Sequence, residues 1–232
     1  MFSLVSLPFF ASCAARVSGT LQADGQADLN VYAALEPRMT MLLGTLAAAS
    51  GTAQPGAPLL NGPSISASMS ATPGVESASL ANRTPSAIEG PVRVSQIGDF
   101  LAHGSAQGFI SFEQGTASRD GRCAVNLSRD SGPQILSLIS PEIGMYLSAL
   151  MAPLATGEEL TRAEYLLLVG SVYGRGIADE ISQAAIHASV DFPGQIRSAR
   201  GGTFSGRRAE FAIPLLDLLV LETPLSYEVV WR

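Results

Sequence analysis

An Asp-Gly pair between two alternating segments places the strongest constraint on how this chain can fold. Asp24 and Gly25 lie between residues 17–21 and residues 27–35, and a turn of this composition favours an antiparallel β-hairpin. Alternate side chains of a strand share one face, and in the second segment one face is entirely apolar: Leu29, Val31, Ala33 and Leu35. The sequence therefore predicts a hairpin that is buried on one side.

The last third of the chain repeats this alternating pattern. Residues 186–192, 207–213 and 225–231 are predicted strands. An apolar helix over 214–221 separates the last two. The final strand has the most regular apolar face of the protein: Leu225, Tyr227, Val229 and Trp231.

Helices are predicted mainly in the middle of the chain. Thr161 and Glu164 form a capping box, which starts a helix over 162–172. The other predicted elements are a helix that opens at Pro37, strand pairs over 74–96 and 109–128, and helices over 97–102, 131–157 and 177–184. Strand pairs with helices between them indicate the α+β class. We expect antiparallel hairpins and a C-terminal strand set packed against a helical middle segment.

Residues 131–157 carry a single charge, Glu142, so a transmembrane span is the alternative to buried helices there. A span needs about 20 continuous apolar residues. Pro133, Pro141 and Pro153 interrupt the segment. Buried helices or an amphiphilic lid are therefore expected.

The first twelve residues, MFSLVSLPFFAS, are uncharged and mostly apolar, and Cys13 follows them. Signal peptides combine an apolar stretch with small residues before the cleavage site. The segment resembles the lipobox of bacterial lipoproteins, which implies that the sulfur of Cys13 receives diacylglycerol. Because no basic residue precedes the apolar stretch, we expect translation to begin upstream. Residues 1–12 are then a signal-peptide remnant and residues 13–232 a single lipid-anchored domain; the alternatives are a hydrophobic first strand or a disordered tail.

Cys123 is the second of the two cysteines, so a disulfide with Cys13 is one option in an oxidising compartment. Cys123 shares a predicted strand face with Val125 and Leu127. A cysteine in such a place is usually a small buried hydrophobic residue. We therefore expect Cys123 in the core and Cys13 acylated.

Residues 191–206, DFPGQIRSARGGTFSG, place a Pro-Gly turn and a Gly-Gly pair ahead of a further strand. Together with the closing strand over 225–231, this arrangement resembles the LppM-like domain of bacterial envelope lipoproteins. The resemblance covers residues 17–232 in outline and 186–231 in motif. It implies an α+β domain of the cell envelope, facing the periplasm or the exterior, that binds amphiphilic ligands and has no known catalytic reaction.

Several classes of chemistry lack the residues that they need. All 14 basic residues are arginine, which removes the lysine of Schiff-base enzymes, pyridoxal phosphate enzymes and phosphate loops. Two cysteines and two histidines, far apart, give no standard zinc spacing. A net charge of −6 argues against nucleic-acid binding. We expect no cofactor and no metal site.

The alternative to a noncatalytic binding or scaffold module is an envelope hydrolase that uses His187 with a nearby serine, Ser189 or Ser205. His187, Ser189 and Asp191 lie on one polar face of a predicted strand. Side chains on one face of a straight strand point in parallel, so they do not converge as a catalytic triad must. A noncatalytic module is therefore expected.

Four arginines lie within twelve residues that contain no acid: Arg197, Arg200, Arg207 and Arg208. Arginines bind phosphate and carboxylate oxygens, and beside a membrane they attract anionic headgroups. An adaptable apolar surface for acyl chains is expected in the helical middle, from Met145, Leu147, Leu150, Met151 and Leu154. The expected partners are the membrane, through the anchor, and an anionic lipid or an envelope protein. The alternatives are that the arginines protect a strand edge and that the helices only cover the sheet.

Overall fold

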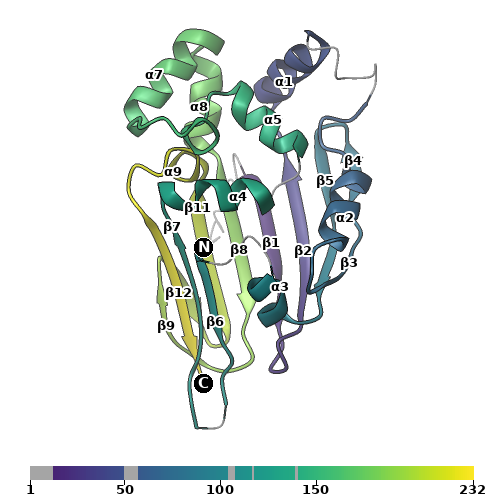
Figure 1. The fold of residues 1–232 in the computed structure, drawn as a ribbon, viewed down its shortest axis with the longest axis vertical. Helices are drawn as coiled ribbons and strands as arrows, with labels where there is room; N and C mark the ends of the chain where they lie inside the picture. The colour runs from purple at the N-terminus through teal and green to yellow at the C-terminus, as the bar shows by residue number, and fades with distance from the viewer. Residues whose placement is uncertain (1–12, 50–56, 104–107, 117, 139–140) are drawn as a thin grey trace, which may run out of the picture.

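The structure, a computed structural model, describes residues 13–49, 57–103, 108–116, 118–138 and 141–232. Two β-sheets lie face to face, and several helices gather at one end of them (Figure 1). Helices and mainly antiparallel strands confirm the predicted α+β class.

Among the described residues, the larger sheet has eight strands. Their spatial order is β10 (Gly202–Ser205), β11 (Arg208–Pro214), β8 (Ala185–Asp191), β1 (Cys13–Leu21), β2 (Ala27–Ala34), β5 (Ala87–Val94) and β3 (Val75–Ala78), with β4 (Ala81–Thr84) also paired to β5. β1 and β8 run parallel, and the other described pairs of this sheet are antiparallel. The hairpin predicted around Asp24 and Gly25 is formed by β1 and β2.

The smaller sheet has four strands in the part of the chain that the structure describes, and both sheets take strands from the C-terminal third of the sequence. Its spatial order is β6 (Ile110–Glu113), β7 (Gly121–Leu127), β12 (Leu225–Trp231) and β9 (Ile196–Arg200). The chain crosses from β9 to β10 of the other sheet at Gly201, whose φ of 75° is a left-handed conformation that favours glycine. Neither β9 nor β10 is among the predicted strands.

The apolar faces of the two sheets meet at one end, which we call the hairpin end because the β1–β2 turn, residues 22–26, lies there. Its buried cluster takes residues from both sheets: Leu21, Ala27, Val94, Phe192, Ile196, Ala209, Val229 and Trp231. Further along, the rings of Phe211 and Tyr227 lie edge to face with centroids 5.8 Å apart, and they join β11 to β12. Side chains from both sheets therefore form one interior.

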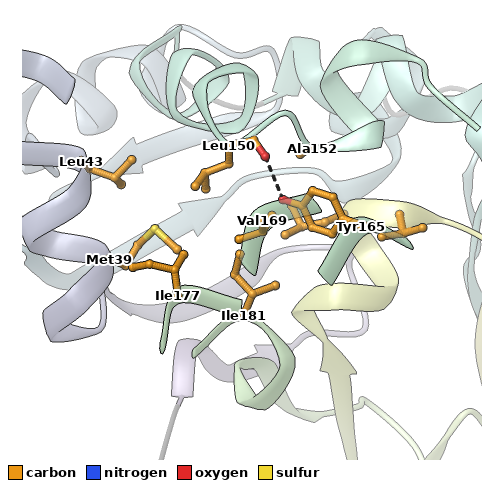
Figure 2. Packing of buried hydrophobic residues seen from close by; sticks show 10 residues of the cluster. Met39, Leu43, Leu150, Ala152, Tyr165, Val169, Ile177 and Ile181 are labelled. Atoms are coloured by element: carbon orange, nitrogen blue, oxygen red, sulfur yellow. Dashed lines mark hydrogen bonds between the residues drawn. The ribbon is translucent and has the colours of Figure 1, made fainter. Parts of the chain in front are cut away.

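The opposite end, which we call the helical end, carries α1 (Pro37–Ala49), α5 (Pro141–Ala149), α7 (Arg162–Tyr173), α8 (Arg175–Gln183) and α9 (Leu215–Val220). A second buried cluster joins these helices (Figure 2). Tyr165 lies fully buried within it, and its hydroxyl donates to the carbonyl oxygen of Leu150 at 3.3 Å. The predicted capping box of Thr161 and Glu164 starts α7 as expected.

The remaining helices are short: α2 (Gly62–Ser70), α3 (Ile97–His103), the 3-10 turn η1 (Arg129–Ser131), α4 (Gly132–Leu138) and α6 (Pro153–Thr156). α2 is not among the predicted helices; the Asn61 side chain caps it by accepting from the Ser64 N–H at 3.1 Å. The described residues of the 131–157 segment belong to several short helices. Within the described residues, no helix has both the length and the apolar character needed to cross a membrane.

Candidate functional site

Cys13 is the first residue of β1, and its backbone is paired with that of Ala185, the first residue of β8. Because β8 follows α8 directly, Cys13 lies at the helical end. The predicted signal segment, residues 1–12, and the side chain of Cys13 lie outside what the structure describes. Acylation of Cys13 stays a prediction, and a lipid attached there would begin at the helical end.

Three of the four predicted anion-binding arginines have carboxylate partners from other segments. The ion pairs and their N···O distances are Arg208–Asp191, 2.6 Å, Arg200–Glu228, 3.6 Å, and Arg197–Asp120, 3.7 Å. The hydrogen bond from Arg208 lowers the pKa of Asp191. Sequence spacing could not reveal these partners, because strand pairing brings them in from β8, β12 and the end of the β6–β7 connection.

Arg207 differs from its three neighbours. Its Nε donates to the carbonyl oxygen of Phe192 at 2.8 Å, and among the described residues no carboxylate oxygen lies within 4.0 Å of its guanidinium nitrogens. Arg208 pairs with Asp191, the last residue of β8, so both arginines lie at the hairpin end. The length of β8, about 20 Å at the usual rise per residue, separates them from the helical end. The structure therefore does not bring the arginines and the Met- and Leu-rich helices into one site.

Those helices contribute largely to the core. Leu150 and Leu154 are buried in two of the apolar clusters, and Leu147 packs against both clusters. Met145 is the exception, since 52% of it is exposed. The helical middle thus covers the sheets more than it offers an open apolar surface.

In the hydrolase alternative, Ser205 and Asp191 lie away from His187, whereas Ser189 is two residues from His187 on the same strand. Ser205 is paired with Arg208 on β11, which in turn is paired with Asp191, four residues along β8 from His187. That offset amounts to about 13 Å along the strand. Asp191 is bound by Arg208, and among the described residues no hydrogen bond joins His187 to a serine.

Three apolar side chains on inner strands of the larger sheet keep part of their surface accessible to solvent. In the strand register Val17 lies opposite Ala188, and Ala188 lies opposite Phe211, so all three face the smaller sheet. Val17, Ala188 and the neighbouring inward-facing Ile186 are only half-buried, although β1 and β8 are inner strands of the sheet. Among the described residues, none of the four buried clusters includes these three side chains.

Cys123 lies on the facing surface of the smaller sheet, opposite Val229. It is a free thiol, packs against the cluster at the hairpin end and stays half-buried. Burial raises the pKa of this thiol to about 11. Cys123, which we expected in the core, therefore lies on the inner face of the smaller sheet at the border of that core.

A cleft at the helical end was not predicted. It has a volume of about 470 Å³ and lies between η1 with α4, α6 and the end of α9. Arg129 lines it, and the Nε of this guanidinium is buried with no hydrogen-bond partner. Arg129 stands alone in the sequence, and only the fold brings residues 153–159 and 220–221 beside it. Within the described residues, no group of three His, Cys, Asp or Glu side chains is arranged to hold a metal ion.

Comparison with known proteins gives a distant likeness of fold alone. No family model and no curated protein matches the chain. Among solved structures, the NMR structure of the folded domain of LppM from Mycobacterium tuberculosis is similar, with a TM-score of 0.37 and 10% sequence identity. The match covers 97% of this chain and 92% of that domain.

Proposed function

We propose that this chain is a noncatalytic, lipid-anchored domain of a bacterial cell envelope that holds the apolar chain of an amphiphile between its two sheets. The observation that carries the proposal is the half-buried centre of the interior around Val17, Ile186 and Ala188. Side chains on inner strands of a fully packed sandwich lose nearly all contact with solvent. Accessible apolar surface at this place suits a linear apolar ligand.

The position of Cys13 at the helical end supports an orientation for the anchored domain. A lipid on Cys13 would hold the helical end toward the membrane, and the hairpin end with Arg207 would point away from it. Arg207 is the arginine best placed to receive an anionic group, because it donates to a carbonyl oxygen instead of a carboxylate. That group would belong to a ligand or an envelope protein approaching from the aqueous side.

The test is binding of a fluorescent fatty acid, cis-parinaric acid, to the unacylated Cys13→Ser chain. Val17→Phe fills the interior and is expected to weaken binding strongly. Ser18→Phe is the matched control, because the adjacent residue of β1 faces the other side of the sheet and should leave binding unchanged. If cis-parinaric acid binds both variants equally well, or does not bind the Cys13→Ser chain at all, the interior is not the ligand site.

A second experiment examines the anionic partner. Arg207→Gln should weaken binding of an anionic amphiphile and leave that of its uncharged analogue unchanged. Arg200→Gln serves as the control, since Arg200 is already paired with Glu228. If neither substitution changes the affinity for the anionic amphiphile relative to the uncharged one, the arginines do not bind the ligand. Their role is then to protect the strand edge.

A further inference from the structure

The cleft at the helical end combines an apolar wall with charged groups of both signs. Its apolar residues come from α4, α6 and the end of α9, and include Leu136, Leu154, Val220 and Leu221. Three of these are buried. The volume of about 470 Å³ lies within the usual range of small-molecule sites.

Arg129 is the most unusual group in this wall. Its Nη2 donates to the carbonyl oxygen of Leu160 at 2.7 Å, which fixes one edge of the guanidinium. Its Nε is buried and has no partner, and among the described residues no carboxylate lies within 4.0 Å of its guanidinium nitrogens. A buried charged donor without an acceptor is costly, so an acceptor brought by a ligand would be bound favourably.

Three carboxylates line the same cleft without reaching Arg129: Asp130, Glu158 and Glu159. All three are exposed. They disfavour a ligand with several negative charges, such as a phosphate, and they attract an amine. The cleft therefore suits a molecule that carries one carboxylate, one amine and an apolar part.

The backbone of the apolar wall is also unusual. Leu221 ends α9 with a φ of 46° and is buried. This left-handed residue ends the helix, and its N–H donates to the carbonyl oxygen of Asp217. Leu221 lies in the cleft wall together with Arg129.

We propose that this cleft binds a small zwitterion with an apolar side chain, the chemistry of a free amino acid or a dipeptide. The carboxylate lies on Arg129, because a guanidinium forks onto carboxylate oxygens. The amine lies toward Glu158 and Glu159, and the apolar side chain packs on Leu136 and Leu154. This site is separate from the interior proposed for the amphiphile.

The test is calorimetric titration of the full chain with four probes: L-leucine, leucyl-leucine, leucinamide and 4-methylpentanoate. Leucine or leucyl-leucine should bind, and whichever binds more tightly identifies the ligand as an amino acid or a dipeptide. Leucinamide, which lacks the carboxylate, and 4-methylpentanoate, which lacks the amine, should each bind at least about tenfold more weakly. Leucinamide binding as tightly as leucine, or no binding of any probe up to about 10 mM, would overturn the proposal.

Substitutions test which residues bind the zwitterion. Arg129→Met should abolish binding of the zwitterions, and Arg175→Met, an exposed arginine of α8 outside the cleft, should leave it unchanged. Unchanged affinity in Arg129→Met would contradict the proposal. If Arg129→Met does not fold, the Glu158→Gln/Glu159→Gln variant decides: it should lose affinity for leucine and keep or gain affinity for 4-methylpentanoate. The reverse pattern would contradict the assigned orientation.

Discussion

The carboxylate of Glu180 accepts a hydrogen bond of 2.8 Å from the backbone N–H of Met39, and the two residues lie on different helices of the helical end. Its other oxygen accepts from the N–H of Arg38 at 3.0 Å. A helix start leaves such donors unpaired, and negative charge there is favourable. Glu180 of α8 therefore caps α1 across a tertiary contact.

Removing this charge should destabilise the helical end. We expect Glu180→Gln to lower the free energy of unfolding by about 1 kcal/mol, because an amide both loses the charge and offers only one acceptor. Urea denaturation followed by circular dichroism measures the change. Asp179→Asn is the control, an exposed neighbour on α8 whose loss should change stability by less than about 0.5 kcal/mol. Equal effects of the two substitutions would argue against the cap.

A side chain in place of Gly121, at the hairpin end, should lower the stability of the fold. A Cβ at Gly121 would overlap the indole ring of Trp231, which is buried between the sheets. Gly121→Ala should therefore cost about 1–3 kcal/mol of stability through overpacking. Gly44→Ala makes a sharp contrast, because a Cβ in the middle of α1 meets nothing within 4 Å, and there the change should stabilise by about 0.5–1 kcal/mol. Thermal and urea unfolding of both variants test the pair.

The thiol of Cys123 should react slowly at neutral pH. Burial raises its pKa to about 11, and only the thiolate reacts with iodoacetamide. Alkylation, followed residue by residue with peptide mass spectrometry, should accelerate as the pH rises toward 11. The folded state holds the proton more tightly than the unfolded state, so stability is retained below pH 9.0, the ordinary pKa, and falls between 9.0 and about 11. Fast labelling at pH 7 in the folded protein would contradict this.

The carboxylate of Glu228 should make folding sensitive to acid. The hydrogen bond from Arg122 lowers the pKa of Glu228, and the charge of Arg200 adds to the effect. A lowered folded pKa gives stability above the unfolded value of 4.5 that is lost as the pH falls through the folded pKa. Glu228→Gln should therefore flatten the decline in stability below pH 4.5, which unfolding curves at several pH values measure. An unchanged decline would assign acid sensitivity to other carboxylates.

The proposed acylation of Cys13 can be tested directly in a bacterial expression host. Metabolic labelling with a fatty-acid probe should mark the wild-type protein and leave Cys13→Ser unlabelled. Cys123→Ser is the matched control and should keep the label, because its thiol lies between the sheets. If the Cys13→Ser protein still carries the label, Cys13 is not the acylated residue.

Local patterns were sufficient for many elements of this fold. The Asp24-Gly25 turn and the alternation over 27–35 predict β1 and β2, and the Thr161 capping box predicts the start of α7. β10 is harder to see, because its four residues include Gly202 and two hydroxyl residues. Its strand conformation comes from pairing with β11. A short edge strand of this kind has little apolar alternation to detect.

The candidate sites depended far more on tertiary structure. The arginine cluster was visible in the sequence, but the partners Asp120, Asp191 and Glu228 come from segments that only sheet pairing brings near. Arg129 had no neighbouring motif, and its cleft joins three separated segments. Sequence spacing shows which charged residues share one helix or strand. Ion pairs and clefts form between elements that are distant in the sequence, so spacing does not reveal them.

The parallel pairing of β1 with β8 sets an order for the making of this protein. β1, the first strand that the structure describes, lies in the middle of the larger sheet, and its neighbour β8 is synthesised only after the helical middle. Until β8 is synthesised, one edge of β1 in the β1–β2 hairpin stays unpaired. An unpaired strand edge can associate with another chain. Contacts between such distant segments also slow folding. A nascent chain of this protein would therefore be most vulnerable to aggregation before residue 185 emerges, and a chaperone that shields the free edge of β1 would have its greatest effect in that interval.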